Sequence, residues 1–219
     1  MKTTVTAIAL AATAAFAAAD VQITEIWTGL SGADGTEDWI EVTWNGQGTF
    51  DTGSIFYDDS SADLGAAGQL DSFILSSGES AIFLLDADPA NGAAFATAIE
   101  EFLAIWGNVS NVGYTNGGGG LGQGGDTANL LDAAGNVLDS LSYDASGDIA
   151  TFEKVNGVTR LSVLGENGAY SSDQFENTNG VFGAETFGSL IGSPGVVPAP
   201  AGAALFGLGG LAAARRRRA

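Results

Sequence analysis

The side chains of this sequence that could do acid–base chemistry are almost all carboxylates. The chain has 26 Asp and Glu residues, seven Lys and Arg residues, and neither His nor Cys. Without His and Cys, Ser-His-Asp and Cys-His nucleophile systems and His-ligated zinc are excluded. A pair of carboxylates can hydrolyse a glycoside without His, but no spacing singles out one pair. We predict no catalytic residue, and a carboxylate-dependent hydrolase of glycans or peptides stays an alternative.

One stretch, Phe50–Ser54 (FDTGS), matches the signature that carries a catalytic aspartate in aspartic proteases. In that mechanism Asp51 would be one of two carboxylates that share a proton. The second carboxylate loop is missing, because no other Asp-Thr-Gly or Asp-Ser-Gly occurs in the chain. We therefore interpret the stretch as a turn in which Asp and Gly have ordinary turn roles.

A second pattern, Gly120–Gly125 (GLGQGG), fits the Gly-x-Gly-x-x-Gly form of dinucleotide-binding loops. Dinucleotide binding needs a strand before this loop and a helix after it. Here a Gly-rich stretch comes before it and a strand-like stretch follows it. We therefore predict no bound cofactor.

A third pattern, Asp86–Gly92 (DADPANG), resembles a calcium-binding loop but departs from the EF-hand sequence. Position twelve of the loop would be Thr97, where an EF-hand has Glu. A looser site could use this loop, or Asp58, Asp59 and Asp63. We assign no metal ligand, and a calcium-dependent binding domain stays a second alternative.

The acidic residues make most of the chain strongly negative. All 26 of them lie between residues 20 and 197, where Lys154 and Arg160 are the only basic residues, so this region carries a net charge of −24. Such a surface repels nucleic acid phosphates and anionic lipid headgroups. We therefore expect no nucleic-acid partner.

The first 19 residues have the three parts of a secretory signal peptide. Lys2 precedes an apolar run from Val5 to about Ala15, and the small residues Ala17 and Ala19 precede Asp20. We predict cleavage between Ala19 and Asp20. The alternative is an Ala-rich first helix, which fits less well because a strand-like pattern begins abruptly at Asp20.

Residues 21–85 follow the patterns of β-strands. In residues 39–44 (WIEVTW), Ile40, Val42 and Trp44 fall on one face and Glu41 and Thr43 on the other, a period of two. Gly, Ser and Asp clusters separate the candidates. We predict strands at residues 21–27, 39–44, 54–57, 73–75 and 81–85, the last two buried on both faces.

Residues 93–106 follow a helical period instead. Phe95, Ile99, Phe102 and Trp106 have spacings of four, three and four, and Gly107 ends the pattern. Further strands are predicted at residues 127–131 and 136–143, as a hairpin, and at residues 158–163. Seven to nine short strands and one inserted helix predict a mainly β fold, a β-sandwich formed by residues 20–195 as one domain.

The predicted domain resembles the lamin-tail domain family as it occurs in secreted bacterial proteins. One departure is Thr52–Asp58 (TGSIFYD), where the family usually has a Gly-Trp pair. The resemblance implies an immunoglobulin-like β-sandwich and brings no catalytic residues. The motifs that carry it are, in order, Ile23–Trp27 (ITEIW), Asp38–Val42 (DWIEV), Leu75–Glu79 (LSSGE), Gly125–Ser140 (GDTANLLDAAGNVLDS) and Gly192–Gly195 (GSPG).

The last residues, 196–219, resemble a sorting signal of the PEP-CTERM type. The Pro-Glu-Pro motif corresponds to Val197, Pro198, Ala199 and Pro200, with Ala in place of Glu. An apolar segment (residues 201–214) and a basic stop follow. The basic stop is formed by Arg215, Arg216, Arg217 and Arg218.

The length of the apolar segment favours transient membrane insertion. Residues 201–214 would form about 21 Å of helix, whereas a stable span needs roughly 20 apolar residues. Gly207, Gly209 and Gly210 weaken the helix, and the arginines would stay on the cytoplasmic side. A permanent tail anchor is the alternative.

These patterns together predict a non-enzymatic, exported protein of the cell surface or extracellular matrix. Its expected partner is an exosortase-like transpeptidase that cuts near Pro198–Pro200. Once released, the domain would act as a structural, adhesive or binding module, with extracellular polysaccharide or other matrix components as possible partners.

Overall fold

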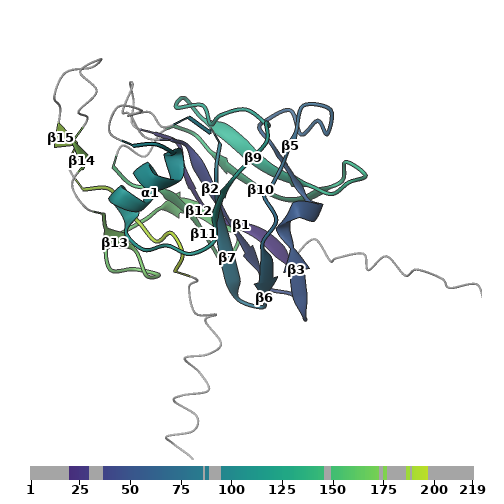
Figure 1. The fold of residues 1–219 in the computed structure, drawn as a ribbon, viewed down its shortest axis with the longest axis horizontal. Coiled ribbons are helices and arrows are strands. Elements are labelled where there is room, and N and C mark those ends of the chain that lie inside the picture. Colours follow the sequence, from purple (N-terminus) through teal and green to yellow (C-terminus); the bar gives the residue numbers. More distant parts are fainter. Residues whose placement is uncertain are drawn as a thin grey trace, which may run out of the picture.

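Six strands form the largest sheet of the protein. The computed structural model describes residues 20–29, 37–85, 87–88, 95–145, 149–172, 175–176, 186–187 and 189–196. The six strands are Val21–Trp27 (β1), Trp39–Trp44 (β2), Glu79–Leu84 (β7), Val112–Tyr114 (β8), Phe152–Val155 (β11) and Val158–Leu161 (β12). Their order across the sheet is β12-β11-β1-β2-β7-β8 (Figure 1), and only β7 and β8 pair in parallel.

A second sheet of four antiparallel strands packs against the first. Its strands are Phe56–Asp58 (β4), Gly68–Gln69 (β5), Asp126–Leu131 (β9) and Val137–Tyr143 (β10). Across the sheet they follow the order β10-β9-β4-β5. Three two-stranded pairs complete the described strands: Thr49–Asp51 (β3) with Ile74–Ser76 (β6), Tyr170–Ser171 (β13) with Ile191–Gly192 (β16), and Phe175–Glu176 (β14) with Thr186–Phe187 (β15).

The main core lies between the two large sheets. Ile40, Val42 and Phe83 of the first sheet share one buried cluster with Tyr57 and Leu130 of the second. Alternation along each strand points these side chains inward, and their burial is the main favourable term in folding. The protein is therefore mainly β, with two sheets around a shared core, as expected of a β-sandwich.

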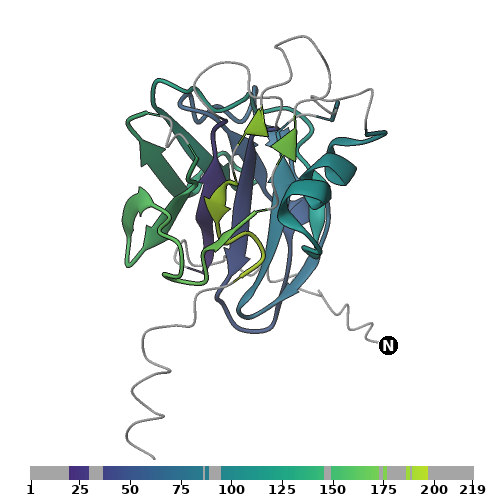
Figure 2. The same ribbon diagram turned by 90° about the vertical axis from the view of Figure 1, so that its left-hand side faces the viewer.

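The opposite face of the six-stranded sheet is also covered, by the α-helix Ala98–Trp106 (α1). Figures 1 and 2 show α1 lying on this face, away from the four-stranded sheet. Trp39 meets the rings of Phe102 and Trp106 edge-on, each with ring centroids 5.8 Å apart. Because helix and sheet bury both of its faces, β2 has no exposed side chain.

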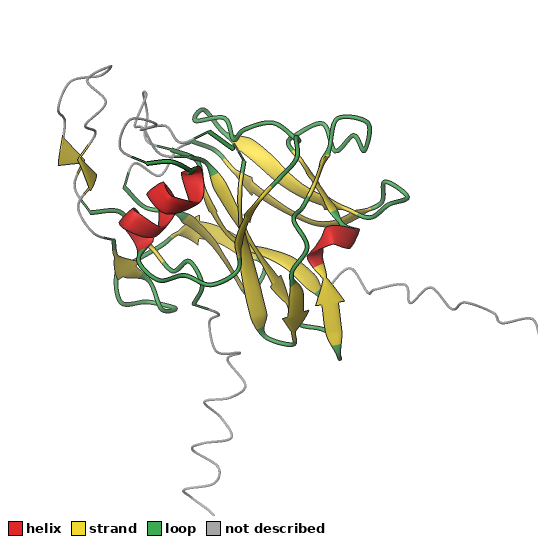
Figure 3. Cartoon of the chain, viewed as in Figure 1, coloured by secondary structure: helices red, strands yellow, loops and turns green. Residues whose placement is uncertain are grey.

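Helix α1 begins at Ala98, five residues later than the predicted start at residue 93. The Thr97 side chain accepts a hydrogen bond from the Glu100 backbone N–H at 3.1 Å, and Thr97 itself is extended. The N–H groups of the first helical turn have no acceptor within the helix. The Thr97 side chain provides one for the Glu100 N–H, and this N-cap fixes the start of α1. Gly107, with φ 80°, ends the helix as predicted. Figure 3 colours α1 red, together with the short 3-10 helix Thr52–Ser54 (η1).

The structure confirms most of the predicted strands, although bounds differ (β4 begins at Phe56, after η1) and the short strands β3, β5, β8 and β13 to β16 were not predicted. The predicted strand at residues 73–75 forms as β6, but Ile74 is 64% exposed, so β6 is not buried on both faces. The strand β11 was not predicted. It pairs with β12 through a two-residue turn in which Asn156 and Gly157 have φ 52° and 78°, values typical of a tight hairpin.

The two ends of the chain lie outside the described residues, and with them the predicted signal peptide (residues 1–19) and all of the predicted sorting signal (residues 196–219) except Val196. Within the described ranges, the structure contains no helix long and apolar enough to cross a membrane. The predicted apolar segment, residues 201–214, is not among those ranges.

Candidate functional site

Three glutamates lie side by side on the six-stranded sheet. Glu25 of β1 is directly opposite Glu41 of β2 on one side and Glu153 of β11 on the other. Opposite residues of an antiparallel pair share a face, so the three side chains form a row. All three are at most 2% exposed. Charged groups are almost never buried like this without partners, so the row needs an explanation.

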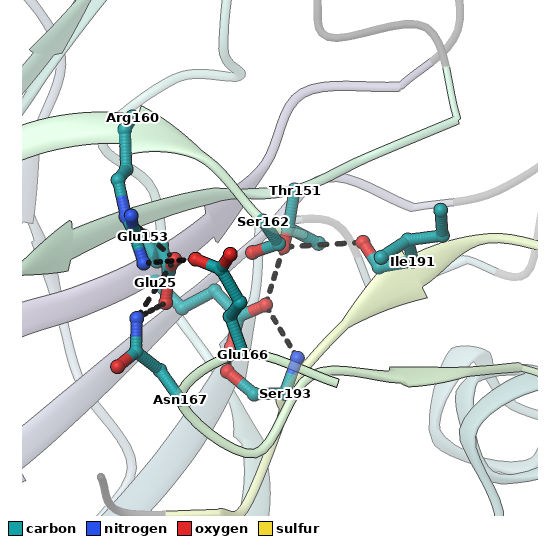
Figure 4. Close-up of polar contacts among 9 residues, drawn as sticks. All are labelled: Glu25, Thr151, Glu153, Arg160, Ser162, Glu166, Asn167, Ile191 and Ser193. Atoms are coloured by element: carbon teal, nitrogen blue, oxygen red, sulfur yellow. Dashed lines mark hydrogen bonds and ion pairs between the residues drawn. The ribbon is translucent and has the colours of Figure 1, made fainter. Parts of the chain in front are cut away.

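The partners of Glu25 come mainly from a segment near the end of the described chain. We call residues 189–196 the C-terminal segment. Ser193 gives Glu25 two hydrogen bonds, from its backbone N–H to Oε1 and from its hydroxyl to Oε2, both 2.8 Å long (Figure 4). The Thr151 hydroxyl donates a third, to Oε1. These donors stabilise the carboxylate but bring no positive charge.

Glu41 has fewer partners than Glu25. Its Oε2 accepts a hydrogen bond of 3.3 Å from the backbone N–H of Gly195, again in the C-terminal segment. Its Oε1 is buried without a hydrogen-bond partner. An unsatisfied buried oxygen on a charged group is costly, which favours the protonated form of this side chain.

Burial shifts both of these acids in the same direction. Burial raises the pKa of Glu25 to about 7, and hydrogen bonds from Thr151 and Ser193 oppose part of that rise. Burial, together with the nearby charge of Glu25, raises the pKa of Glu41 to about 8, and hydrogen bonding by Ser80, Gly195 and Thr24 opposes part of that rise. The pair therefore retains a proton near neutral pH.

Glu153, by contrast, has a cationic partner. Arg160 Nε lies 2.9 Å from its Oε1, and Arg160 Nη2 lies 3.1 Å from Glu166. The Asn167 amide donates to both Glu153 oxygens, at 3.1 and 3.2 Å. Figure 4 shows these groups converging from β11, β12 and the turn that follows. Thus one end of the row is an ion pair, and the Glu25–Glu41 end is not.

Backbone contacts also fasten the C-terminal segment to the fold. Ile191 accepts from Thr151 N–H at 2.9 Å and donates to Ile149 at 2.7 Å. The Leu190 side chain is buried in the cluster under α1. A Cβ added to Gly192 would lie 2.8 Å from Glu25 Oε1 and 2.9 Å from Trp106, so only glycine fits there without movement. The hydrogen bonds to the Glu25 and Glu41 carboxylates therefore hold the C-terminal segment on the six-stranded sheet.

A small hollow with two glutamates in its lining, Glu37 and Glu101, lies beside α1. Its space measures about 10 Å³, roughly enough for one water molecule. Trp39 Nε1, which lines it, is buried without a hydrogen-bond partner. A water held there would satisfy this donor. The hollow is lined by Trp27, Glu37, Trp39, Ala98, Glu101, Phe102, Ile105 and Trp106.

The structure places the predicted Phe50–Ser54 stretch in a turn. Asp51 caps η1, and its Oδ1 accepts hydrogen bonds from Gly53 N–H at 2.9 Å and from the Ser72 hydroxyl at 2.7 Å. This is the turn role that the sequence favoured for Asp51. Gly120–Gly125 is followed by strand β9, again as predicted.

The candidate calcium residues bond to their own loop. Asp58 accepts from the Asp63 backbone N–H at 2.7 Å, and Asp63 accepts from Gly65 N–H at 2.9 Å. No group of three or more Asp, Glu, His or Cys in the described part of the chain is arranged to hold a metal ion. Most of the Asp86–Gly92 loop lies outside the described residues.

Of the predicted processing residues, the structure describes Asp20 alone. The Asp20 carbonyl accepts a hydrogen bond of 2.6 Å from Asn45 N–H, beside the start of β1. Ala17 and Ala19 lie outside the described residues. The same holds for the whole sorting motif, Val197–Pro200, and for Arg215–Arg218.

Sequence reasoning did not find the glutamate row. A signal was present in residues 39–44, because Trp39 and Trp44 fall on opposite faces of that strand. Large apolar residues on both faces indicate a strand that is covered on both sides, which would bury Glu41. No comparable signal identifies Ser193 as the partner of Glu25, 168 positions earlier.

Comparison with known proteins adds no relative. No protein-family model, no curated protein and no solved structure matches this chain. The fold and the site therefore define a mainly β, sandwich-like domain whose C-terminal segment is held by hydrogen bonds to buried carboxylates.

Proposed function

We propose that this chain is a non-enzymatic, exported β-sandwich protein of the lamin-tail type, with an immunoglobulin-like arrangement of its sheets. Residues 1–19 are its signal peptide, and residues 196–219 are its sorting signal. An exosortase-like transpeptidase cuts near Pro198–Pro200 and passes the domain to the cell surface or the extracellular matrix. There the domain acts as a structural, adhesive or binding module.

The observation that carries this proposal is the junction at residue 196. The hydrogen bonds to Glu25 and Glu41 fasten the chain as far as Gly195, and Val196 N–H donates to Ser193 at 2.8 Å. The Val197–Pro200 motif begins at the next position. A processing motif directly after a segment that is hydrogen-bonded to the fold suits a cut that leaves the described domain complete.

The glutamate row supports a module better than a hydrolase. A glycosidase needs two carboxyl groups facing an open cleft, about 5 to 10 Å apart. Glu25 and Glu153 are buried and occupied by donors of the chain itself. Their role in this proposal is to hold the C-terminal segment, and the partner of the module is extracellular polysaccharide or another matrix component.

Cell fractionation with and without residues 197–219 tests the proposal. We expect the complete chain in the surface or matrix fraction, without peptides that contain Leu205–Leu211. The truncated chain should be missing from that fraction, because it lacks the signal that the enzyme reads. Recovery of intact Leu205–Leu211 peptides from the mature surface protein would contradict cleavage.

A pair of proline variants separates the motif from a general effect on folding. Pro198→Ala combined with Pro200→Ala should leave an uncut precursor in the membrane fraction. Pro89→Ala, the same change outside the tail, should be processed like the natural chain. Equal processing of the two variants would show that Val197–Pro200 is not the recognised motif.

A further inference from the structure

The exposed apolar side chains of the protein are concentrated in one short stretch. Among the described residues, eight large apolar side chains are exposed, and four of them lie within residues 158–164. Single exposed apolar residues are normal on a protein surface, whereas a contiguous group marks a contact site. The four are Val158, Leu161, Val163 and Leu164.

The C-terminal segment adds another apolar side chain to this group. The turn that begins at Val163 is closed by two hydrogen bonds, from Glu166 N–H to Val163 at 2.9 Å and from Gly165 N–H to Ala169 at 2.9 Å. A Cβ built on Gly168 in this turn would lie 2.5 Å from Val196. Val196 therefore packs on the turn. We call Val163, Leu164 and Val196 the apolar patch.

The figures show where this patch lies. In Figures 1 and 2 the yellow end of the C-terminal segment lies beside the green turn that precedes β13. The segments that carry the patch therefore lie near the point at which the chain leaves the described fold toward residue 197. If residues 201–214 enter a membrane, that membrane comes close to the patch.

The charge next to the patch differs from that of the rest of the domain. The hairpin of β11 and β12 contains Lys154 and Arg160, the only basic residues between positions 20 and 197. Arg160 pairs with Glu153 and Glu166, and Lys154 Nζ lies 2.6 Å from Asp139. These two cations offset two of the three carboxylates that they contact, while the net charge of the region is −24. The negative charge beside the hairpin is therefore reduced, which weakens its repulsion from a lipid surface.

The length of the connection limits how far the patch can be from a membrane. Four residues, 197–200, separate Val196 from the apolar segment, and they reach about 14 Å when fully extended. As a helix, the 14 apolar residues would span about 21 Å, less than the roughly 30 Å of a bilayer core. With Arg215–Arg218 held at the far side, the start of the apolar segment is drawn inward, and little length remains to hold the domain away.

We infer that the apolar patch rests on the outer surface of the lipid bilayer in the uncut precursor, with its exposed side chains among the lipid headgroups. This inference depends on the proposed membrane insertion of residues 201–214. It adds the orientation of the domain: β12 and the turn after it face the membrane, and the four-stranded sheet does not. Cutting near Pro198–Pro200 then releases the patch together with the domain.

Fluorescence quenching by lipids tests this orientation. The chain has no Cys, so Leu164→Cys places one environment-sensitive label in the patch. Val137→Cys is the matched control, because Val137 is also exposed but begins β10 of the other sheet. Residues 20–219 of each variant are reconstituted in phosphatidylcholine vesicles, with or without headgroup spin-labelled lipid. We expect loss of emission at Leu164→Cys and none at Val137→Cys.

The other outcomes are distinguishable. If the chain floats with the vesicles but the spin-labelled lipid quenches neither label, or both equally, the inferred orientation is wrong. If the chain does not float with the vesicles, the proposed membrane insertion of the tail fails, and this inference fails with it. A shift of the Leu164→Cys label that depends on protein concentration without vesicles would instead indicate contact between copies of the chain.

Discussion

Glu25 and Glu41 lie opposite each other on neighbouring strands, and neither has a cationic partner among the described residues. Two ionised carboxylates in a buried site repel each other and lose hydration. Holding a proton removes one of the charges. The protonation of this pair should therefore be visible in the stability of the whole domain.

We predict that this pair lowers the stability of the domain as the pH rises. The folded-state pKa values are raised, to about 7 for Glu25 and about 8 for Glu41, above the ordinary value of 4.5. The folded state therefore holds protons more tightly than the unfolded state, and this contribution is present below pH 4.5 and lost as the pH rises through 7 to 8. Since one unit of pKa shift corresponds to about 1.4 kcal/mol, the loss should amount to several kcal/mol between pH 5 and pH 9, measured by urea unfolding.

The other acidic residues also contribute to the pH dependence of stability, so the effect of the buried pair is measured by comparing variants. Glu41→Gln should lose part of the fall between pH 5 and pH 9 and be more stable than the natural chain at pH 9. Glu79→Gln, which removes an exposed carboxylate, should keep the fall. If the two variants show the same pH dependence, the buried pair is not its source.

The sequence predicts which face of β2 each residue occupies but not what covers that face. Ile40 and Val42 were expected to share a face, and both lie in the main core. Glu41 was expected on the opposite face, and its burial depends on the C-terminal segment, about 150 positions later. Burial by a distant segment leaves no mark in the local period of the strand.

At the scale of the elements, the long strands were predictable because their periods are long enough to read. β1, β2 and β7 have six or seven residues each, and the predicted hairpin of β9 and β10 forms. The Asn156-Gly157 turn was a usable signal for the β11–β12 hairpin that went unused. Two-residue strands such as β16 contain no period, so the docking of the C-terminal segment was not predictable.

Gly192 tests how tightly that segment is packed. A Cβ at this position would meet Glu25 Oε1, Thr151 and Trp106 at 2.8 to 2.9 Å. We expect Gly192→Ala to cost about 1–3 kcal/mol, the usual cost of overpacking. Gly124→Ala is the matched control, since its Cβ would meet no atom within 4 Å. If both variants have the same midpoint in urea unfolding, the C-terminal segment can shift to accommodate the added methyl group, and its packing is not tight.

At the scale of the whole molecule, an acidic surface surrounds the two-sheet core. The net charge of −24 between residues 20 and 197 opposes the compact state by self-repulsion. The fold class was predictable from strand spacing and turns, because both are repeated along the whole chain. The sequence did not predict which acidic residues are exposed and which are buried, because the amino-acid composition is the same whichever of them are buried.

We predict that salt stabilises the domain without regard to the kind of cation. Raising NaCl from 20 to 200 mM should raise the melting temperature, because the repulsion is screened. Calcium and magnesium chloride at 1 mM and equal ionic strength should then give equal melting temperatures. A higher melting temperature with calcium alone would favour the calcium-dependent binding domain, because a specific ligand stabilises the folded state by mass action.

The hydrogen bonds between Ser193 and Glu25 also set the order of events when the protein is made. A chain is synthesised from its N-terminus, so β1 and β2 exist long before their cover does. Glu25 must wait for a partner 168 positions later, and contacts this distant in sequence form slowly. Until Ser193 and Gly195 have emerged, Glu25 and Glu41 lack the hydrogen bonds that the C-terminal segment gives them. The fold is therefore completed only when nearly the whole chain is available, by the segment that directly precedes the predicted tail.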